Sequence, residues 1–305
     1  MTNKNETLNI DYDLLMDLRV DFAFKCFAEG NPESLISILN AIFANAKIKR
    51  IVKSVRLKNP TMYKKSIEDK LSILDVRAEL DDGTDILIEM HLHGLGQLKS
   101  KTIRSWARAY SEELETGQRY TQQPPTITIA FANGAVEPIK TAQNTKNKIH
   151  RVCMIMDKDD GTIFTEALEL HYIDMKAFAK AVNEANSINI KETHEDMFAY
   201  WLSIITQKEI VNKDIIENAR KEKEVIQMAV LAIARQSEDK IMRQAYQRRK
   251  DELFFHNLEV EQLKCQVEQS DRRAEQSNRR AEQAEKASEE KDAIIAQLKA
   301  RLGEN

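Results

Sequence analysis

The stretch KLSILDVRAELDDGTDILIEMHLH, residues 70–93, decides the fold class of this chain. Two apolar runs flank Asp81, Asp82 and Gly83. An Asp-Gly step between two such runs is a typical hairpin signal, because glycine tolerates the positive φ that tight turns need. The sequence therefore predicts two antiparallel strands, residues 71–80 and 85–93, joined by this turn.

The expected register of this hairpin brings two acids together. If Leu80 and Thr84 close a three-residue loop, Asp75 lies directly opposite Glu89, and opposite Cβ atoms in an antiparallel pair are about 5 Å apart. Both acids interrupt apolar runs, where a carboxylate is costly to bury without compensation. A divalent cation would compensate both, and Mg²⁺ typically uses one or two carboxylates together with water and phosphate oxygens. Asp75 and Glu89 are therefore candidate ligands of Mg²⁺ or Mn²⁺.

His91 lies two residues beyond Glu89 and so is expected on the same face of the strand. An imidazole there could orient a water molecule or contact a phosphate, and metal-bound water is a nucleophile at neutral pH. This arrangement points to metal-assisted hydrolysis of phosphodiesters. The competing interpretation is structural, because paired acids on a hairpin often face solvent and a lone strand histidine is often simply hydrogen-bonded.

The pattern around the hairpin mixes helix and strand. A helix predicted over residues 100–115 carries a basic side, on which Lys101, Arg104 and Arg108 are candidate phosphate contacts. A solvated basic face explains the same residues equally well. Hydrophobic periodicity predicts one further helix and four further strands in the first 180 residues. They are the helix 34–46 and the strands 51–57, 126–132, 151–156 and 168–173.

These pieces together resemble the PD-(D/E)XK nuclease family transposases, also described as recombination-promoting nucleases. Each motif is weak alone, but their order and spacing are specific, and the resemblance spans roughly residues 17–180. The motifs are DFAFK (21–25), LISILNAIF (35–43), Asn59-Pro60, DKLSILDV (69–76), Gly83, IEMH (88–91), a helix with Arg104, Trp106, Tyr110, Gly117 and Tyr120, and TITIAF (126–131).

The resemblance implies an α/β fold of the restriction-endonuclease type, a mixed sheet flanked by helices, and a magnesium-dependent DNA endonuclease. By motif, Asp75 and Glu89 are the metal-binding acids, and the backbone carbonyl of Met90 adds a ligand. Asp21 is a candidate helper acid, although a charge at a helix N-terminus explains it as well. His91 stands where such nucleases place lysine and where this family usually places glutamine. The proline of the family's name is also absent, since Leu74 precedes Asp75.

The C-terminal part has a different pattern. From about residue 251, apolar or small residues alternate at spacings of four and three, which is the seam of a coiled coil. The middle of the seam is mostly Ala and Ser, and a single solvated charged helix is the alternative. The seam residues are Leu263, Val267, Ser270, Ala274, Ser277, Ala281, Ala284, Ser288, Lys291, Ile295, Leu298 and Leu302.

Composition limits the remaining possibilities. A net charge of −3 means that DNA must be bound by a local basic patch. Three widely spaced cysteines give no zinc or disulfide pattern, and the N-terminus has no apolar signal core, so a cytoplasmic protein without a membrane segment is expected. The predicted organisation is a nuclease-like domain over 11–180, a helical region over 181–250 and a coiled coil over 251–305 that forms homo-oligomers. Residues 174–185 are expected to link the last strand to the helical region, in which helices are predicted over 195–206 and 222–235.

The expected function is DNA cleavage with Mg²⁺ or Mn²⁺. The alternative is a catalytically inactive nuclease fold that binds DNA or assembles complexes through its tail. His91, in the place of lysine or glutamine, keeps this alternative open.

Overall fold

The computed structural model describes residues 10–59, 61–62, 72–73, 75–93, 95–112, 119–136, 148–184 and 196–303. Its contacts divide the chain into one compact unit that ends at Arg249 and a second unit that starts at Lys250. The motif positions Pro60, 69–71, Leu74 and Gly117 lie outside the described residues.

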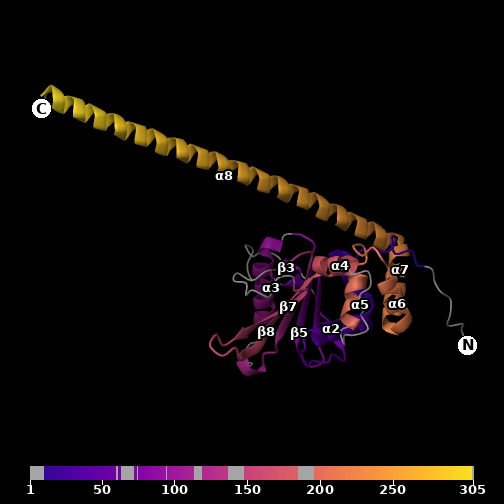
Figure 1. Ribbon diagram of the computed structural model, residues 1–305. Coiled ribbons are helices and arrows are strands. Elements are labelled where there is room, and N and C mark those ends of the chain that lie inside the picture. Colours follow the sequence, from indigo (N-terminus) through magenta and orange to yellow (C-terminus); the bar gives the residue numbers. More distant parts are fainter. Residues whose placement is uncertain are drawn as a thin grey trace, which may run out of the picture. The chain divides into compact units, whose positions relative to one another are not determined.

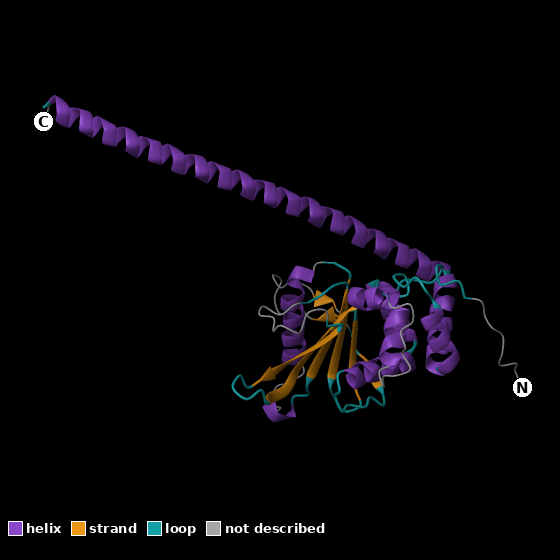
Figure 2. Cartoon of the chain, in the orientation of Figure 1, coloured by secondary structure: helices purple, strands orange, loops and turns teal. Residues whose placement is uncertain are grey.

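The centre of the first unit is a six-stranded mixed sheet (Figures 1 and 2). Strands β5, β6 and β8 are parallel to one another, and the other pairs are antiparallel. This is the mixed α/β sheet that the sequence predicts. In spatial order the strands are β1 (Val55–Leu57), β4 (Val76–Leu80), β5 (Asp85–His91), β6 (Thr126–Ala132), β8 (Ile163–Asp174) and β7 (His150–Met156).

The β4–β5 hairpin has the expected register. Leu80 N–H donates to the carbonyl of Thr84 at 2.9 Å, and Gly83 adopts a φ of 83° in the three-residue loop. The ladder pairs Val76 with Ile88, which confirms the pairing scheme derived from the sequence. The ladder ends at Val76, so the predicted pairing of Asp75 with Glu89 lies one step beyond it.

The single strand expected over residues 71–80 is wrong in one respect. The structure has two short strands, β3 (Ser72–Ile73) paired with β2 (Thr61–Met62), and then β4. Asp75 lies at a bend just before β4. The Asp75 carboxylate accepts a hydrogen bond from the backbone of Met90 in β5. The backbone ladder between β4 and β5 ends one residue later, at Val76.

Helices cover both faces of the sheet (Figure 1). The first face is covered by α3 (Leu98–Glu112), whose Ala109 packs on Leu87 and whose Leu98 packs on Ala130 and Tyr172. On the opposite face lie α1 (Asp21–Gly30) and α2 (Pro32–Asn45), which place Phe24 against Phe131 and Phe43 against His171. Two 3₁₀ turns flank α3 in the sequence, at Leu95–Gln97 and Tyr120–Gln122.

Four further helices complete the first unit, and α5 and α7 pack against α1 and α2. The helices predicted over 195–206 and 222–235 are confirmed with small shifts. The helix α6 was not predicted, and residues 174–185, expected as a link, form a helix as well. The bounds are α4 (Met175–Glu184), α5 (Asp196–Ile205), α6 (Asp214–Glu222) and α7 (Glu224–Glu238).

Two strands differ most in length from the prediction, and β5 ends at His91 instead of residue 93. β8 begins at Ile163 instead of residue 168, because its first half pairs with β7 and is largely exposed, so no apolar alternation marks it. β1 covers only Val55–Leu57 of the expected 51–57. The tail is one continuous helix, α8 (Lys240–Leu302), of 63 residues. Among the described residues, no helix has the length and apolar character needed to cross a bilayer.

Candidate active site

Asp75 is held beside the C-terminal end of β5. The backbone N–H of Met90 donates a hydrogen bond to Asp75 Oδ2, with a separation of 2.5 Å. Burial, together with the negative charges of Asp21 and Glu89, raises the pKa of Asp75 to about 7, against the lowering effect of this hydrogen bond. A cation that binds this carboxyl group displaces its proton into the solvent.

Glu89 is almost completely buried, with 2% of the residue exposed. Its Oε2 lies 2.9 Å from His91 Nε2 and 3.2 Å from Lys101 Nζ. Burial opposes ionisation, but the His91 hydrogen bond and the charges of Lys101 and His91 outweigh it and lower the pKa of Glu89 to about 2. Glu89 is therefore a carboxylate at neutral pH, and the structure confirms that His91 shares its face of β5.

Asp21, at the first turn of α1, belongs to the same acidic cluster. Its charge contributes to the raised pKa of Asp75. The guanidinium of Arg249, 228 residues further along the chain, forms an ion pair with both Asp21 carboxylate oxygens, with Nε 2.9 Å from each. Sequence reasoning missed Arg249, because nothing in the local pattern of a helical, charged segment marks it as a partner of Asp21.

These residues fit a divalent cation. Glu89 Oε1 is buried and has no hydrogen-bond partner in the structure, while Oε2 is engaged by His91 and Lys101. A buried carboxylate oxygen without a partner is costly, and coordination would satisfy it. In the described part of the chain no three His, Cys, Asp or Glu side chains are arranged to hold a metal ion. Asp75 and Glu89 offer two carboxylates, a donor set that Mg²⁺ uses together with water and phosphate.

The three basic candidates on α3 have different surroundings. Lys101 is half-exposed and touches Glu89, and Arg104 is exposed. Arg108 is more buried and pairs with Glu112 one turn later, at 3.5 Å. Glu112 also pairs with Arg77 of β4, so Arg108, Glu112 and Arg77 form one ion cluster. The structure thus brings Lys101 to the acids and places Arg108 in a separate cluster.

A buried polar chain lies on the opposite face of the sheet. Asn45 Nδ2 contacts His150 Nδ1 at 2.7 Å, His150 Nε2 contacts His171 Nδ1 at 2.8 Å, and His171 Nε2 contacts Glu169 Oε1 at 2.5 Å. Burial and the neighbouring His171 and Lys148 lower the pKa of His150 to about 3. With neutral imidazoles, each hydrogen bond of the chain is donated in the same direction. Asn45 donates to His150, His150 donates to His171, and His171 donates to Glu169. Only the period-two spacing of Glu169 and His171 in LELHYI hints at this chain in the sequence.

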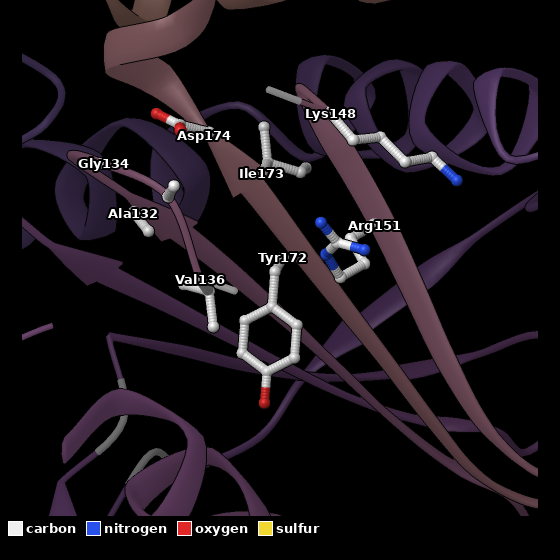
Figure 3. Close-up of a pocket in the computed structure, with 9 residues that line it drawn as sticks. Ala132, Gly134, Val136, Lys148, Arg151, Tyr172, Ile173 and Asp174 are labelled. Carbon is white, nitrogen blue, oxygen red and sulfur yellow. The ribbon is translucent and has the colours of Figure 1, made fainter. Parts of the chain in front are cut away.

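A small pocket lies at the C-terminal ends of β6 and β8 (Figure 3). This is the sheet edge that also carries His91, since His91 pairs with Ala132 and Ala132 with Asp174. Arg151 lies beside Tyr172, and Asp174 lies on the other side of the pocket (Figure 3). Side chains of both charges line it, Lys148 and Arg151 with Asp174.

Comparison with known proteins gives one match. The family model described as PD-(D/E)XK nuclease family transposase matches residues 18–262. The match begins where the sequence motifs begin and runs well past residue 180, so it includes α5, α6, α7 and the start of α8. No curated protein and no solved structure matches the chain.

Proposed function

Because the chain belongs to the PD-(D/E)XK nuclease family transposases, we propose that it is a DNA endonuclease that requires Mg²⁺ or Mn²⁺. The observation that carries the proposal is the pair Asp75 and Glu89. One acid is held at a raised pKa by burial and by neighbouring negative charge, and the other has a buried oxygen without a partner. Ionised Asp75 is unfavourable beside Glu89, and a cation bound to both acids would offset this repulsion.

We assign the metal-holding role to Asp75, Glu89 and the backbone carbonyl of Met90. When bound, a divalent cation supplies an activated water and positive charge for the phosphate. Met90 N–H keeps the Asp75 carboxylate in place beside β5. His91 orients Glu89 through Oε2, which leaves Oε1 for the cation.

Lys101 and Arg104 provide the positive charge that a DNA backbone needs near the site. Both lie in the first two turns of α3 and have exposed side chains. Phosphate contacts of this kind position the nucleic acid without reading its sequence. Asp21 acts as a helper acid, and its pairing with Arg249 limits the negative charge that the site presents to DNA. The three free cysteines accord with a reducing cytoplasm as the place of action.

A second candidate function is an inactive nuclease fold that binds DNA or assembles complexes. It is favoured by His91, which stands at the position of the family's lysine or glutamine and is hydrogen-bonded to Glu89. In such a protein the acids would bind metal without cleavage. One measurement distinguishes the two functions.

That measurement is plasmid nicking by the full chain with Mg²⁺ or Mn²⁺, beside EDTA and Asp75→Ala reactions. Asp159→Ala is a matched control, because Asp159 is an exposed acid in the β7–β8 loop. We expect nicking by the wild type and by Asp159→Ala, and none with EDTA or with Asp75→Ala. A wild type that binds the metal but leaves several DNA substrates intact between pH 6 and 9 would establish the inactive alternative.

A further inference from the structure

The second unit consists of a helix whose described apolar side chains are exposed or half-buried. No described residue from Lys250 onward is buried. Leu263, Val267, Ile295 and Leu298 are between 50% and 59% exposed. An isolated helix gains little stability from propensity alone, and most helices in proteins depend on packing of an apolar face. This face therefore requires a partner.

The repeat of the sequence fixes where that face lies. The segments EQSDRRA (268–274), EQSNRRA (275–281) and EQAEKAS (282–288) follow one another with a period of seven residues. In the spacing of four and three, the a positions are Val267, Ala274, Ala281, Ser288, Ile295 and Leu302, and the d positions are Leu263, Ser270, Ser277, Ala284, Lys291 and Leu298. A seven-residue period keeps this seam on one side of a left-handed supercoil.

We propose that this segment pairs with the same segment of a second copy of the chain as a parallel, in-register, two-stranded coiled coil. β-branched residues at a with leucine at d favour two strands. Each apolar end of the seam has this combination, Val267 with Leu263 and Ile295 with Leu298. The proposal is independent of DNA cleavage.

The charges at the e and g positions favour a parallel orientation of the two helices. In a parallel pair each g residue faces the e residue five positions on in the other chain, and e and g charges set orientation. Glu259 then faces Lys264 of the second copy, and Arg280 faces Glu285 of the second copy. No g–e pair in this arrangement joins like charges between residues 259 and 299.

The antiparallel alternatives are less favourable. Antiparallel chains face e with e and g with g. With the two seams fully overlapped, Asp271 meets Glu285 of the second copy and Arg280 meets Arg280 of the second copy. Like charges placed in this way are destabilising. Sliding one antiparallel chain along the other by one heptad does not remove the repulsion. In one direction Arg273 meets Arg280 of the second copy, and in the other direction Lys264 meets Lys299 of the second copy.

The seam is weak in its middle, where Ala and Ser bury little area. Lys291 adds a polar layer at a d position, which costs stability but restricts register. We therefore expect an association that depends on protein concentration. A parallel arrangement also attaches both copies of the first unit at the same end of the coiled coil.

Cysteine cross-linking of the full chain tests the orientation. Ala274→Cys places a thiol in the seam, whereas the native Cys265 lies at an outer f position and is an internal control. Under mild oxidation we expect Ala274→Cys, but not the wild type, to give a covalent species of twice 35.1 kDa on a non-reducing gel. Absence of this species, or its appearance in equal amount in the wild type, would overturn the parallel pairing.

Sedimentation equilibrium tests the seam without a disulfide. Lys291→Leu fills the d layer with an apolar side chain and should lower the dissociation constant at least tenfold. Lys286→Leu, at an outer f position, makes the same chemical change one turn away and should leave the constant unchanged. Equal effects of the two variants, or a best fit to trimers, would contradict the proposal.

Discussion

Met90 and Asp75 are joined by a hydrogen bond from a backbone N–H to a carboxylate, with Met90 N and Asp75 Oδ2 2.5 Å apart. Met90 follows Glu89 directly, so this bond ties the first acid of the site to the strand that carries the second. It also explains why Asp75 sits at a bend. The acid is held by its side chain, and its position relative to Glu89 is set before any cation binds.

Metal binding should depend on both acids and on pH. Isothermal titration of Mn²⁺ or Mg²⁺ into the wild type should show binding that is lost in Asp75→Asn and in Glu89→Gln, and kept in Asp159→Asn. Because the pKa of Asp75 is raised to about 7, binding should release protons and weaken as pH falls below about 7. Binding that survives both substitutions would place the metal elsewhere.

The two acids should have opposite effects on the stability of the metal-free protein. The folded pKa of Asp75, about 7, lies above its ordinary value of 3.8, so its stabilising contribution is complete below about pH 4 and is lost as pH rises to about 7. Asp75→Asn should therefore raise the free energy of unfolding at pH 8 by about 1 to 2 kcal/mol. The gain should vanish towards pH 4.

Glu89 has the reverse sign, because its folded pKa of about 2 lies below its ordinary value of 4.5. Its contribution is present above about pH 4.5 and is lost as pH falls towards 2. Glu89→Gln should lower the free energy of unfolding at pH 8 by on the order of 2 kcal/mol. Denaturant titration at pH 4 and 8 checks both variants, and equal shifts of the same sign would refute the assigned surroundings.

Substitutions of His91 distinguish an active nuclease from an inactive one by their effect on DNA cleavage. If His91 orients Glu89, His91→Ala should reduce DNA cleavage by about 10- to 100-fold with little change in DNA affinity, the range typical of groups that support metal ligands. His91→Gln should keep most activity, because an amide also donates a hydrogen bond to Glu89 Oε2. Cleavage gained only in His91→Gln or His91→Lys would show that the wild-type site is silent because of this residue.

The Asp21–Arg249 ion pair should couple the start of α1 to the start of α8. Its partial exposure limits the coupling energy to about 0.5 to 1 kcal/mol. A double-mutant cycle with Asp21→Asn, Arg249→Met and both together, followed by thermal unfolding, measures it. We expect the double variant to be more stable than the sum of the two single effects implies, and a coupling energy of zero would remove Arg249 from the site.

The Glu169–His171–His150 chain should be structural rather than catalytic. Glu169→Ala removes the acceptor of a buried imidazole N–H, which should cost about 1 to 3 kcal/mol of stability. Metal binding measured below the melting temperature should be unchanged, since the chain lies on the face of the sheet opposite Glu89. Loss of metal binding in the folded variant would show that the two faces are linked.

Much of the fold follows from local pattern. The turn is predicted by the residues Asp81, Asp82 and Gly83. The alternation of apolar residues on each side of it predicts the strand register, in which Asp75 is opposite Glu89. The same register puts His91 beside Glu89, which the structure bears out. The strand 126–132 and the helices 195–206 and 222–235 were also readable, because their apolar residues recur with the period of the element that they form.

What the sequence by itself determined is therefore the hairpin, its register and the family, since each depends on residues close together in the chain. Only the tertiary structure decided which charges surround the acids. Lys101 reaches Glu89 from α3, and Arg249 reaches Asp21 across 228 residues. Burial in a particular core then separates two similar carboxyl groups into one of raised and one of lowered pKa. Periodicity cannot carry such information, because desolvation and Coulomb interactions depend on distances between segments that only packing brings together.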